Sequence, residues 1–361
     1  MNIKNTVIIL LVCIINAHGI TQSHHAIFED KVILITGGAG FLGKGLIKAI
    51  LPYNPREIRI FSRDEVKHAI CQQEFNNHPR LTFLLGDRRD YDAVLHATKG
   101  ADVVIDAGAH KRIDMMESNV QECIKTNIIG TMNVFNACVA NNVKRAVFIS
   151  TDKSASPINI YGASKFVSEK IFTNYEYSKI KTIFSAVRYG NVMHSTGSVI
   201  PFFIQKIKNG EPLTLTDPRM TRFIISLEEA IELIFMALHY SVGGETFVKK
   251  LPALTILDLI EILKKKYNGE NPIVITGIRP GEKIHETLIN DSEAARTYDF
   301  KEFYIITPTL PYQKDAHIPL YKAEGTLLDA ETFGNYSSDK CLVCQEEIDS
   351  LFNKFNLYKK L

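Results

Sequence analysis

The feature that most restricts the fold is a series of short apolar runs, rich in Val, Ile and Phe, that alternate with longer amphipathic stretches from residue 31 onward. The runs are almost continuously apolar, which is typical of parallel strands covered by helices on both faces. The pattern predicts an α/β fold with a doubly wound, Rossmann-type parallel sheet. The predicted strands are Val32–Thr36, Ile58–Ser62, Leu81–Leu85, Val103–Ala107, Ala146–Ser150 and Ile183–Arg188.

Beyond the last of these strands the alternation ends, and helical stretches such as Leu227–Ala237 and Ile256–Lys265 are interleaved with loops. We expect a Rossmann domain over residues 31–195. A smaller C-terminal substrate-binding lobe is expected over residues 196–310, with some segments returning to the sheet. No long linker separates the two, so they should pack together. Residues 311–361 are weakly patterned and form a predicted C-terminal tail.

Composition excludes several kinds of partner. The 361 residues carry a formal net charge of only +2, which provides no broad basic surface for nucleic acid. The six cysteines are scattered, and the pair Cys341 and Cys344 has no second pair at a spacing suited to zinc. We therefore expect a small-molecule substrate, no nucleic acid and no metal.

The first predicted strand leads into the loop GGAGFLG, in which Gly37, Gly40 and Gly43 have the spacing GxxGxxG. Glycines let a backbone turn sharply and approach a pyrophosphate, whose charge the helix N-terminus stabilises. Such a loop also arises for steric reasons alone. Its place at the end of the first strand favours a dinucleotide-binding loop that includes Phe41 and Leu42.

The second strand ends in Ser62, Arg63 and Asp64, near the place where an acidic residue binds the ribose of NAD. Here the basic residue comes first. Arg63 and Ser62 could clamp a 2′-phosphate, which favours NADP over NAD, although a solvated arginine would give the same pattern. Three further cofactor positions are predicted after later strands: Asp87, beside the adenine, and Ala107 and Gly108, along the cofactor backbone.

A catalytic centre is predicted at the carboxyl end of strand Ala146–Ser150, the edge where open α/β sheets hold ligands. Thr151 lies there, Tyr161 follows ten residues later, and Lys165 follows Tyr161 by four. On a helix, Lys165 could lower the pKa of the tyrosine, so that a tyrosinate accepts a hydroxyl proton as hydride leaves. A YxxxK pair is often a surface pair, but this context favours catalysis.

Two further residues at this edge, Asp152 and Lys153, are not needed by a simple dehydrogenase or epimerase. An acid beside a base suits an elimination, because one group removes an acidic C–H proton while the other protonates a departing hydroxyl. An ordinary phosphate contact by Lys153 is the alternative interpretation.

Seven blocks resemble, in order, the motifs of inverting UDP-N-acetylglucosamine 4,6-dehydratases, which are extended short-chain dehydrogenase/reductase enzymes of the polysaccharide biosynthesis protein family. Tyr161 favours the inverting class, since other relatives usually carry methionine there. The resemblance implies an NADP-dependent lyase acting on UDP-N-acetylglucosamine, of the kind that supplies pseudaminic acid for protein glycosylation. The blocks are Ser62–Glu65, Lys125–Asn127, Ser150–Lys153, Asn159–Ala163, Arg188–Val192, Met220–Phe223 and Gly277–Lys283.

The resemblance also implies the role of each residue. Tyr161, aided by Lys165 and Thr151, accepts the C4 hydroxyl proton as hydride passes to NADP. Lys153 then removes the C5 proton and Asp152 protonates the C6 hydroxyl, after which hydride returns to C6 and C5 is reprotonated on the opposite face. The implied substrate-binding residues are Lys111, Asn191, Thr221, Arg222, Arg279 and Glu282, and Val192 is implied at the cofactor.

Four residues depart from the family pattern: Arg88 replaces a small apolar residue, Asp114 a proline, His194 a glycine and Thr196 an arginine. They bear on the adenine contact and on sugar preference, and leave the catalytic set intact.

Two other functions are compatible with parts of this pattern. A UDP-sugar 4-epimerase shares the cofactor loop and the tyrosine–lysine pair, but Asp152 and Lys153 argue against it. A protein that binds NADP without turnover is the second, and the intact Thr151, Tyr161 and Lys165 argue against that. By analogy with the wider family, helices near Val120–Ala140 and Ser164–Asn174 are expected to form a homo-oligomer interface.

The N-terminal residues 1–30 allow two locations. Lys4, an apolar run from Val7 to Ile15 and small residues ending at Gly19 are typical of a secretory signal. The run is short for a membrane span, and an interfacial anchor or a plain extension fits equally. A cytoplasmic enzyme is favoured because NADP is available there, with secretion or membrane tethering through residues 1–19 as the alternative.

Overall fold

The computed structural model describes residues 24–174, 180–193, 195, 198–309, 321 and 324–355. The signal-like residues 1–19 lie outside the described residues, as do His194 and Thr196. No helix in the described ranges is both long enough and apolar enough to cross a membrane.

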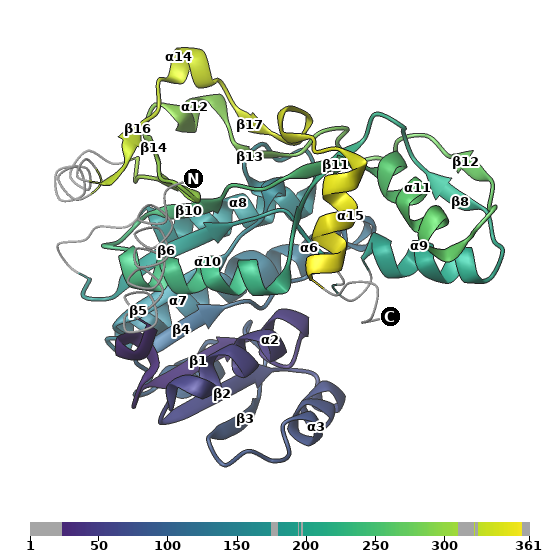
Figure 1. Cartoon of the computed structure of the whole chain (residues 1–361). Coiled ribbons are helices and arrows are strands. Elements are labelled where there is room, and N and C mark those ends of the chain that lie inside the picture. The colour runs from purple at the N-terminus through teal and green to yellow at the C-terminus, as the bar shows by residue number, and fades with distance from the viewer. Residues whose placement is uncertain are drawn as a thin grey trace, which may run out of the picture.

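A ten-stranded sheet forms the centre of the described part (Figure 1). Its parallel portion has the order β3-β2-β1-β4-β5-β6-β10, in which the direction of winding reverses between β1 and β4. This order confirms the predicted doubly wound Rossmann-type sheet. The strands are β1 (Val32–Thr36), β2 (Glu57–Ser62), β3 (Leu81–Leu85), β4 (Val103–Asp106), β5 (Arg145–Ile149), β6 (Ile183–Arg188) and β10 (Thr246–Lys249).

Three antiparallel strands extend the sheet beyond β10, in the order β15, β14 and β16. They lie late in the chain, after the elements of the smaller lobe have begun, so the chain returns from that lobe to the main sheet. Their bounds are β14 (Thr297–Asp299), β15 (Phe303–Ile306) and β16 (Thr326–Leu327).

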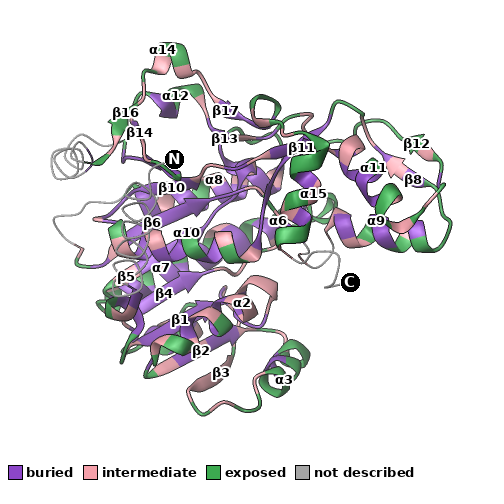
Figure 2. Cartoon of the chain, viewed as in Figure 1, coloured by how far each residue is buried: buried purple, intermediate pink, exposed green. Residues whose placement is uncertain are grey.

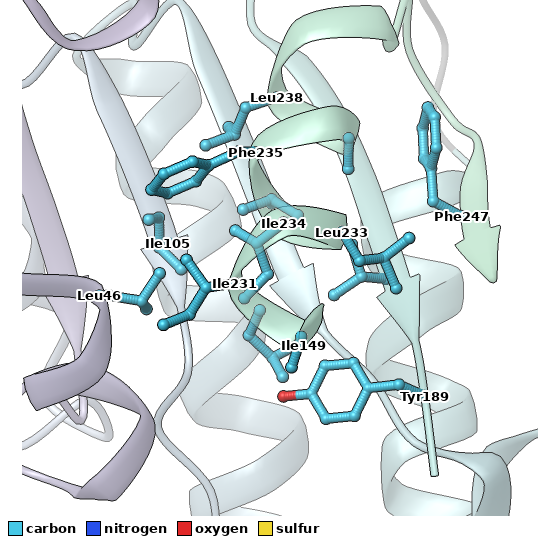
Figure 3. Close-up of a cluster of buried hydrophobic side chains, with 14 of the residues drawn as sticks. Leu46, Ile105, Ile149, Tyr189, Ile231, Leu233, Ile234, Phe235, Leu238 and Phe247 are labelled. Carbon is cyan, nitrogen blue, oxygen red and sulfur yellow. The ribbon is translucent and has the colours of Figure 1, made fainter. Parts of the chain in front are cut away.

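Helices cover both faces of the sheet, as the continuously apolar strands require. Every residue of β1 and of β4 is buried, and Figure 2 shows the sheet as the most buried layer. One face packs against α2 (Phe41–Ile50) and α10 (Leu227–Tyr240), which share a core with inward residues of the strands. In Figure 3, Ile231 and Ile234 of α10 lie against Ile105 and Ile149 of the sheet.

The opposite face packs against α4 (Tyr91–Thr98), α7 (Gly130–Ala140) and α8 (Ile160–Thr173). The predicted helix Val120–Ala140 consists of α6 (Val120–Cys123), a π-helical segment η2 (Ile124–Ile129) and α7. The remaining elements before β6 are η1 (Leu51–Tyr53), α3 (Glu65–Glu74), α5 (Ile113–Ser118) and η3 (Asp152–Ser154).

The smaller lobe has a core of its own. It is formed by α9 (Val199–Lys208), β8 (Leu213–Leu215), α11 (Ile256–Tyr267) and β12 (Ile273–Ile275). Helix α15 (Gln345–Lys354), from the predicted tail, packs its apolar side chains into the same core. The other elements are β7 (Asn191–Val192), β9 (Thr221–Ile225), β11 (Ala253–Thr255), β13 (Thr287–Ile289), α12 (Asp291–Ala294), α14 (Ala330–Phe333), β17 (Tyr336–Ser337) and η5 (Ser338–Cys341).

Residues just before β1 also belong to the main core. Phe28 is fully buried, and its ring lies 4.6 Å from that of Phe235 between centroids. Burying a phenylalanine contributes roughly 1.5–3 kcal/mol to folding, so this segment is part of the packed structure.

Candidate active site

The glycine loop between β1 and α2 forms a tight cradle. A Cβ atom at Gly43 would lie 2.2 Å from the carbonyl oxygen of Gly38. Gly37 has a φ of 64°, and a Cβ there would lie 2.9 Å from the Cα of Gly108, at the end of β4. Gly40 is the N-cap of α2, where Phe41 and Leu42 begin the helix. Only glycine fits these contacts, and the cradle suits a pyrophosphate at a helix N-terminus.

Arg63 and Asp87 lie close together where β2 and β3 end. Arg63 Nη1 is 3.5 Å from Asp87 Oδ2, and Arg63 Nη2 is 3.1 Å from His110 Nε2. The guanidinium is about half exposed, which leaves it able to meet an anion from solvent. Ala107 and Gly108 follow the neighbouring strand β4, so the predicted cofactor positions gather at one edge of the sheet.

The neighbours of Arg63 are occupied locally. The Ser62 hydroxyl lies 2.7 Å from His68 Nε2. Asp64 is the N-cap of α3, where its carboxylate accepts a hydrogen bond from the backbone N–H of Lys67 and pairs with the Lys67 ammonium at 2.8 Å. Of the three side chains, Arg63 is the one directed to other strand ends.

Arg88 does not extend toward solvent beside Asp87. Its guanidinium is buried and donates to Asp106 Oδ2 at 2.7 Å and to Thr131 Oγ1 at 2.8 Å. Asp106 also accepts a 2.5 Å hydrogen bond from Thr36. A Cβ at Gly130 would lie 2.7 Å from the Arg88 side chain, so that glycine makes room for it. The departure at position 88 therefore forms an interior ion pair behind the strand ends.

The predicted acid and base meet immediately after β5. Thr151 caps η3, and its hydroxyl donates to Asp152 Oδ1 at 2.7 Å. The Lys153 ammonium lies 3.1 Å from the same oxygen. Asp152 is fully buried, and its Oδ2 has no hydrogen-bond partner among the described residues. A buried carboxylate with a free oxygen is ready to receive a polar group of a ligand.

Tyr161 and Lys165 lie on α8, whose N-cap is Asn159. The Asn159 side chain caps the helix by accepting from the backbone N–H of Gly162 at 2.7 Å. Burial raises the pKa of Tyr161 to about 12, although the charge of Lys153 and a hydrogen bond with Thr151 lower it. Burial lowers the pKa of Lys165 to about 7. Burial thus makes Lys165 easier to deprotonate, whereas the positive charge of Lys153 favours the tyrosinate form of Tyr161.

The sequence reasoning missed one residue of this cluster, Glu286. Its Oε1 lies 3.1 Å from Lys153 Nζ, and its carboxylate is 3.8 Å from Arg222 Nε and 4.0 Å from Lys283 Nζ. Glu286 lies three residues after the sequence block that ends at Lys283. Nothing in the local sequence around Glu286 indicates an ion pair with Lys153, which is far away in the chain. Only the tertiary fold brings them together.

Arg222 and Thr221, at the start of β9, hold the loop that contains Lys283. The Arg222 guanidinium donates to the carbonyl oxygens of Thr221, Lys283 and Ile284 at 2.7, 3.0 and 3.1 Å. The Thr221 hydroxyl lies 2.9 Å from His285 Nδ1 and 2.6 Å from Ser338 Oγ. Both side chains therefore fasten the loop, and Arg222 also faces Glu286.

The other predicted substrate residues lie on β7 and in loops. Asn191 and Arg222 line a small cavity whose other lining residues are mainly apolar side chains of the smaller lobe. Lys111 and Arg279 are exposed. Glu282 accepts a long hydrogen bond, 3.4 Å, from the backbone N–H of Arg279. Within the described residues, no cluster of His, Cys, Asp and Glu has the arrangement of a metal site.

Comparison with known proteins agrees with this geometry. An inverting UDP-N-acetylglucosamine 4,6-dehydratase of Campylobacter jejuni serotype O:2 is 42% identical over 289 residues, which cover 79% of this chain and 85% of the relative. A UDP-glucose 4-epimerase of Rickettsia bellii is 41% identical over 285 residues, covering 77% and 83%. The X-ray structure of Pen from Bacillus thuringiensis superposes with a TM-score of 0.84 at 36% identity, covering 91% of this chain and 99% of that one.

The family model described as polysaccharide biosynthesis protein matches residues 33–308, which include the glycine cradle, the acid–base pair and the loop around Glu286. The resemblance predicted from the sequence blocks is thereby confirmed, and the chain belongs to the polysaccharide biosynthesis protein family.

Proposed function

We propose that the protein is an NADP-dependent UDP-N-acetylglucosamine 4,6-dehydratase of the C5-inverting class. The observation that carries this proposal is the buried contact of Asp152 with Lys153, beside Tyr161. The two relatives differ in activity and are almost equally similar, so their names alone do not decide between dehydration and epimerisation. The paired acid and base favour dehydration, because an epimerase has no proton to remove from C5 and no hydroxyl to expel.

In this mechanism, a bound nicotinamide cofactor would take a hydride from C4 of the sugar and return it to C6. Tyr161 accepts the C4 hydroxyl proton, with Thr151 hydrogen-bonded to it and Lys165 on the same helix. The C4 ketone makes the C5 proton acidic. Lys153 removes that proton and Asp152 protonates the C6 hydroxyl, which leaves as water.

The cofactor would be held by the glycine cradle and by the ends of β2, β3 and β4. The cradle supports this assignment because a side chain at Gly43 would fill it. Arg63 is our candidate for the contact that selects NADP. The proposed cofactor-binding residues are Gly37, Gly40, Phe41, Leu42, Gly43, Ser62, Arg63, Asp64, Asp87, Ala107, Gly108, Tyr161, Lys165 and Val192.

The UDP-sugar would lie between the sheet edge and the smaller lobe. Arg222 supports this placement, because its guanidinium lies 3.8 Å from Glu286, which in turn contacts Lys153. Guanidinium groups suit a diphosphate. The proposed substrate-binding residues are Lys111, Asn191, Thr221, Arg222, Arg279 and Glu282.

The test is mass spectrometry of UDP-N-acetylglucosamine after incubation with the full chain and NADP in deuterated water. We expect a product that has lost one water and carries one deuterium at C5. An unchanged mass with an altered C4 configuration would establish the epimerase instead. An unchanged sugar would exclude both activities for this substrate.

Replacement of Arg63 by alanine is expected to weaken NADP binding about tenfold or more and to leave NAD binding nearly unchanged, because only NADP carries the 2′-phosphate. Isothermal titration calorimetry measures both constants directly. Arg56→Ala is the matched control, since that arginine lies before β2 and pairs with Asp102. Equal losses for both cofactors would assign Arg63 a structural role.

We also propose a homo-oligomer. Apolar side chains are exposed on the neighbouring helices α6, η2, α7 and α8, including Val120, Ile124, Met132 and Val167. Met132→Glu is expected to yield monomers in size-exclusion chromatography with light scattering, because a charge there is costly to bury. Val66→Glu, on α3, is the control for an exposed apolar residue elsewhere.

A further inference from the structure

Glu286 makes Lys153 a bridge between two carboxylates. The Lys153 ammonium lies 3.1 Å from Asp152 Oδ1 and 3.1 Å from Glu286 Oε1. The three groups come from η3 and from the segment before β13, and both carboxylates are buried. Elimination needs one acid and one base, so the second carboxylate is surplus to the reaction as written above.

The C-terminal segment fixes the position of Glu286. Its backbone N–H donates to Ser338 Oγ at 2.9 Å, and its carbonyl oxygen accepts from the backbone N–H of Ser338 at 2.9 Å. Ser338 is fully buried and also contacts Thr221. Because these hydrogen bonds fix the backbone of Glu286, its carboxylate can hold the Lys153 ammonium in a defined position.

Cations as well as carboxylates surround Lys153. The groups that face Lys153 are Asp152, Glu286, Arg222 from β9 and Tyr161 from α8. Lys283 adds a further cation 4.0 Å from Glu286. Arg222 and Lys283 offset the charges of Asp152 and Glu286, and movement of a proton from Lys153 to Asp152 leaves the net charge of the buried cluster unchanged.

Unsatisfied atoms show that the cluster is built to receive a polar ligand. Glu286 Oε2, Asp152 Oδ2 and Lys283 Nζ are buried without a hydrogen-bond partner in the described part of the chain. Buried polar atoms in native proteins are rarely left in this state. Sugar hydroxyls would supply the missing partners.

We propose that Glu286 is a positioning residue that holds Lys153 opposite Asp152 and sets the pH range in which these two residues share the single proton that elimination needs. The inference rests on the proposed dehydratase function. Burial alone would lower the pKa of Lys153, but Asp152 and Glu286 raise it well above its ordinary value, which agrees with a proton resting on the lysine.

The proton balance closes over one turnover. At rest, Lys153 is an ammonium and Asp152 a carboxylate, and transfer of the shared proton gives a neutral amine and a carboxylic acid. The amine takes the C5 proton, the C–H electron pair forms the C5–C6 double bond, and the C6–O bond breaks as Asp152 protonates the leaving hydroxyl. This elimination returns the pair to its starting protonation. When hydride returns to C6, C5 takes a proton from solvent, and Tyr161 releases to solvent the proton that it accepted from the C4 hydroxyl.

The experiment compares the pH dependence of kcat for dehydration in the parent and in Glu286→Gln. Loss of a negative charge 3.1 Å from Lys153 weakens proton binding by the pair. Both limbs of the bell-shaped profile should therefore move to lower pH by about one unit or more. A lower maximum with unmoved limbs would overturn the proposal, since a merely structural glutamate would act in that way.

Two further variants keep the test decisive if Glu286→Gln folds poorly. Lys283→Met removes a cation from the same cluster and should move both limbs to higher pH. Glu286→Asp keeps the charge and should leave the limbs closer to the parent than to the glutamine variant. Shifts of the same sign in Lys283→Met and Glu286→Gln would refute the electrostatic role.

A measurement without substrate separates this inference from the proposed function. The rate at which acetic anhydride labels Lys153, followed by peptide mass spectrometry against pH, reports its ionisation directly. The midpoint should fall by about one unit or more in Glu286→Gln. That shift without any dehydration by the parent would contradict the function alone, whereas dehydration with superimposed labelling curves would contradict the role of Glu286 alone.

Discussion

Substitution of Lys153 by methionine is expected to reduce dehydration by roughly 10²–10⁴-fold, the usual contribution of a positioned general base. Methionine preserves the length and the apolar stem of lysine but offers no proton acceptor. Mass spectrometry in deuterated water would show the loss of turnover as a fall in the amount of dehydrated product that carries one deuterium at C5.

The matched control for that substitution is Lys144→Met. Lys144 also pairs with a carboxylate, Asp102, at 2.8 Å, but it is largely exposed and lies at the opposite end of β5. Its replacement should leave dehydration within about twofold of the parent, as expected for a surface pair. Dehydration by Lys153→Met within tenfold of the parent would mean that another group removes the C5 proton.

The largest expected effect on stability is that of Arg188→Met. Arg188 is fully buried on β6 and pairs with Glu169 at 2.5 Å and with Glu293 at 2.8 Å. Removal of the arginine leaves the buried Glu169 without the guanidinium that it pairs with and leaves Glu293 with Arg296 at 3.6 Å, which costs about 3–5 kcal/mol of the free energy of unfolding. Urea denaturation at pH 7 would measure the difference.

The control is Arg219→Met, which removes an arginine from an exposed pair with Asp217 and should cost about 0–1 kcal/mol. A loss below 1 kcal/mol in Arg188→Met would show that the buried pairs contribute little.

The pH dependence of the Arg188 effect follows from Glu169. Burial alone would raise the pKa of Glu169, but the charge and hydrogen bonds of Arg188 lower it to about 2. A carboxyl whose pKa is lower in the folded state adds stability above its unfolded pKa, near 4.5, and loses it as pH falls toward 2. The parent's advantage over Arg188→Met should therefore shrink between about pH 5 and pH 2.

The local sequence pattern is sufficient to predict the strands of the Rossmann domain. Strands Val32–Thr36, Leu81–Leu85 and Ile183–Arg188 have the predicted bounds. The other three differ by one residue, at one end in β2 and β4 and at both ends in β5. Continuous apolar runs and a glycine loop are local signals, so they can be recognised without knowing the fold. The predicted helix Val120–Ala140 contains a π-helical turn, Ile124–Ile129, that its apolar spacing did not reveal.

The candidate site was only partly accessible to the same reasoning. Thr151, Asp152, Lys153, Tyr161 and Lys165 were found because they are close in sequence and share one strand end and one helix face. The pKa shifts of these residues could not be predicted in the same way. Burial disfavours the charged form of Lys165, and the charge of Lys153 favours the Tyr161 anion. Both effects depend on how deeply the side chains are buried and on which charges lie beside them in the folded structure.

The sequence by itself determined the α/β class, the cofactor loop and the short motif that holds the acid and base, since each depends on residues a few positions apart. The tertiary structure alone decided that Glu286 joins Lys153, that Arg88 turns inward to Asp106, and that Ser338 of the tail anchors the site. Those contacts join residues distant in the chain, and only the packed fold places charged groups within the few ångströms at which buried charges interact strongly.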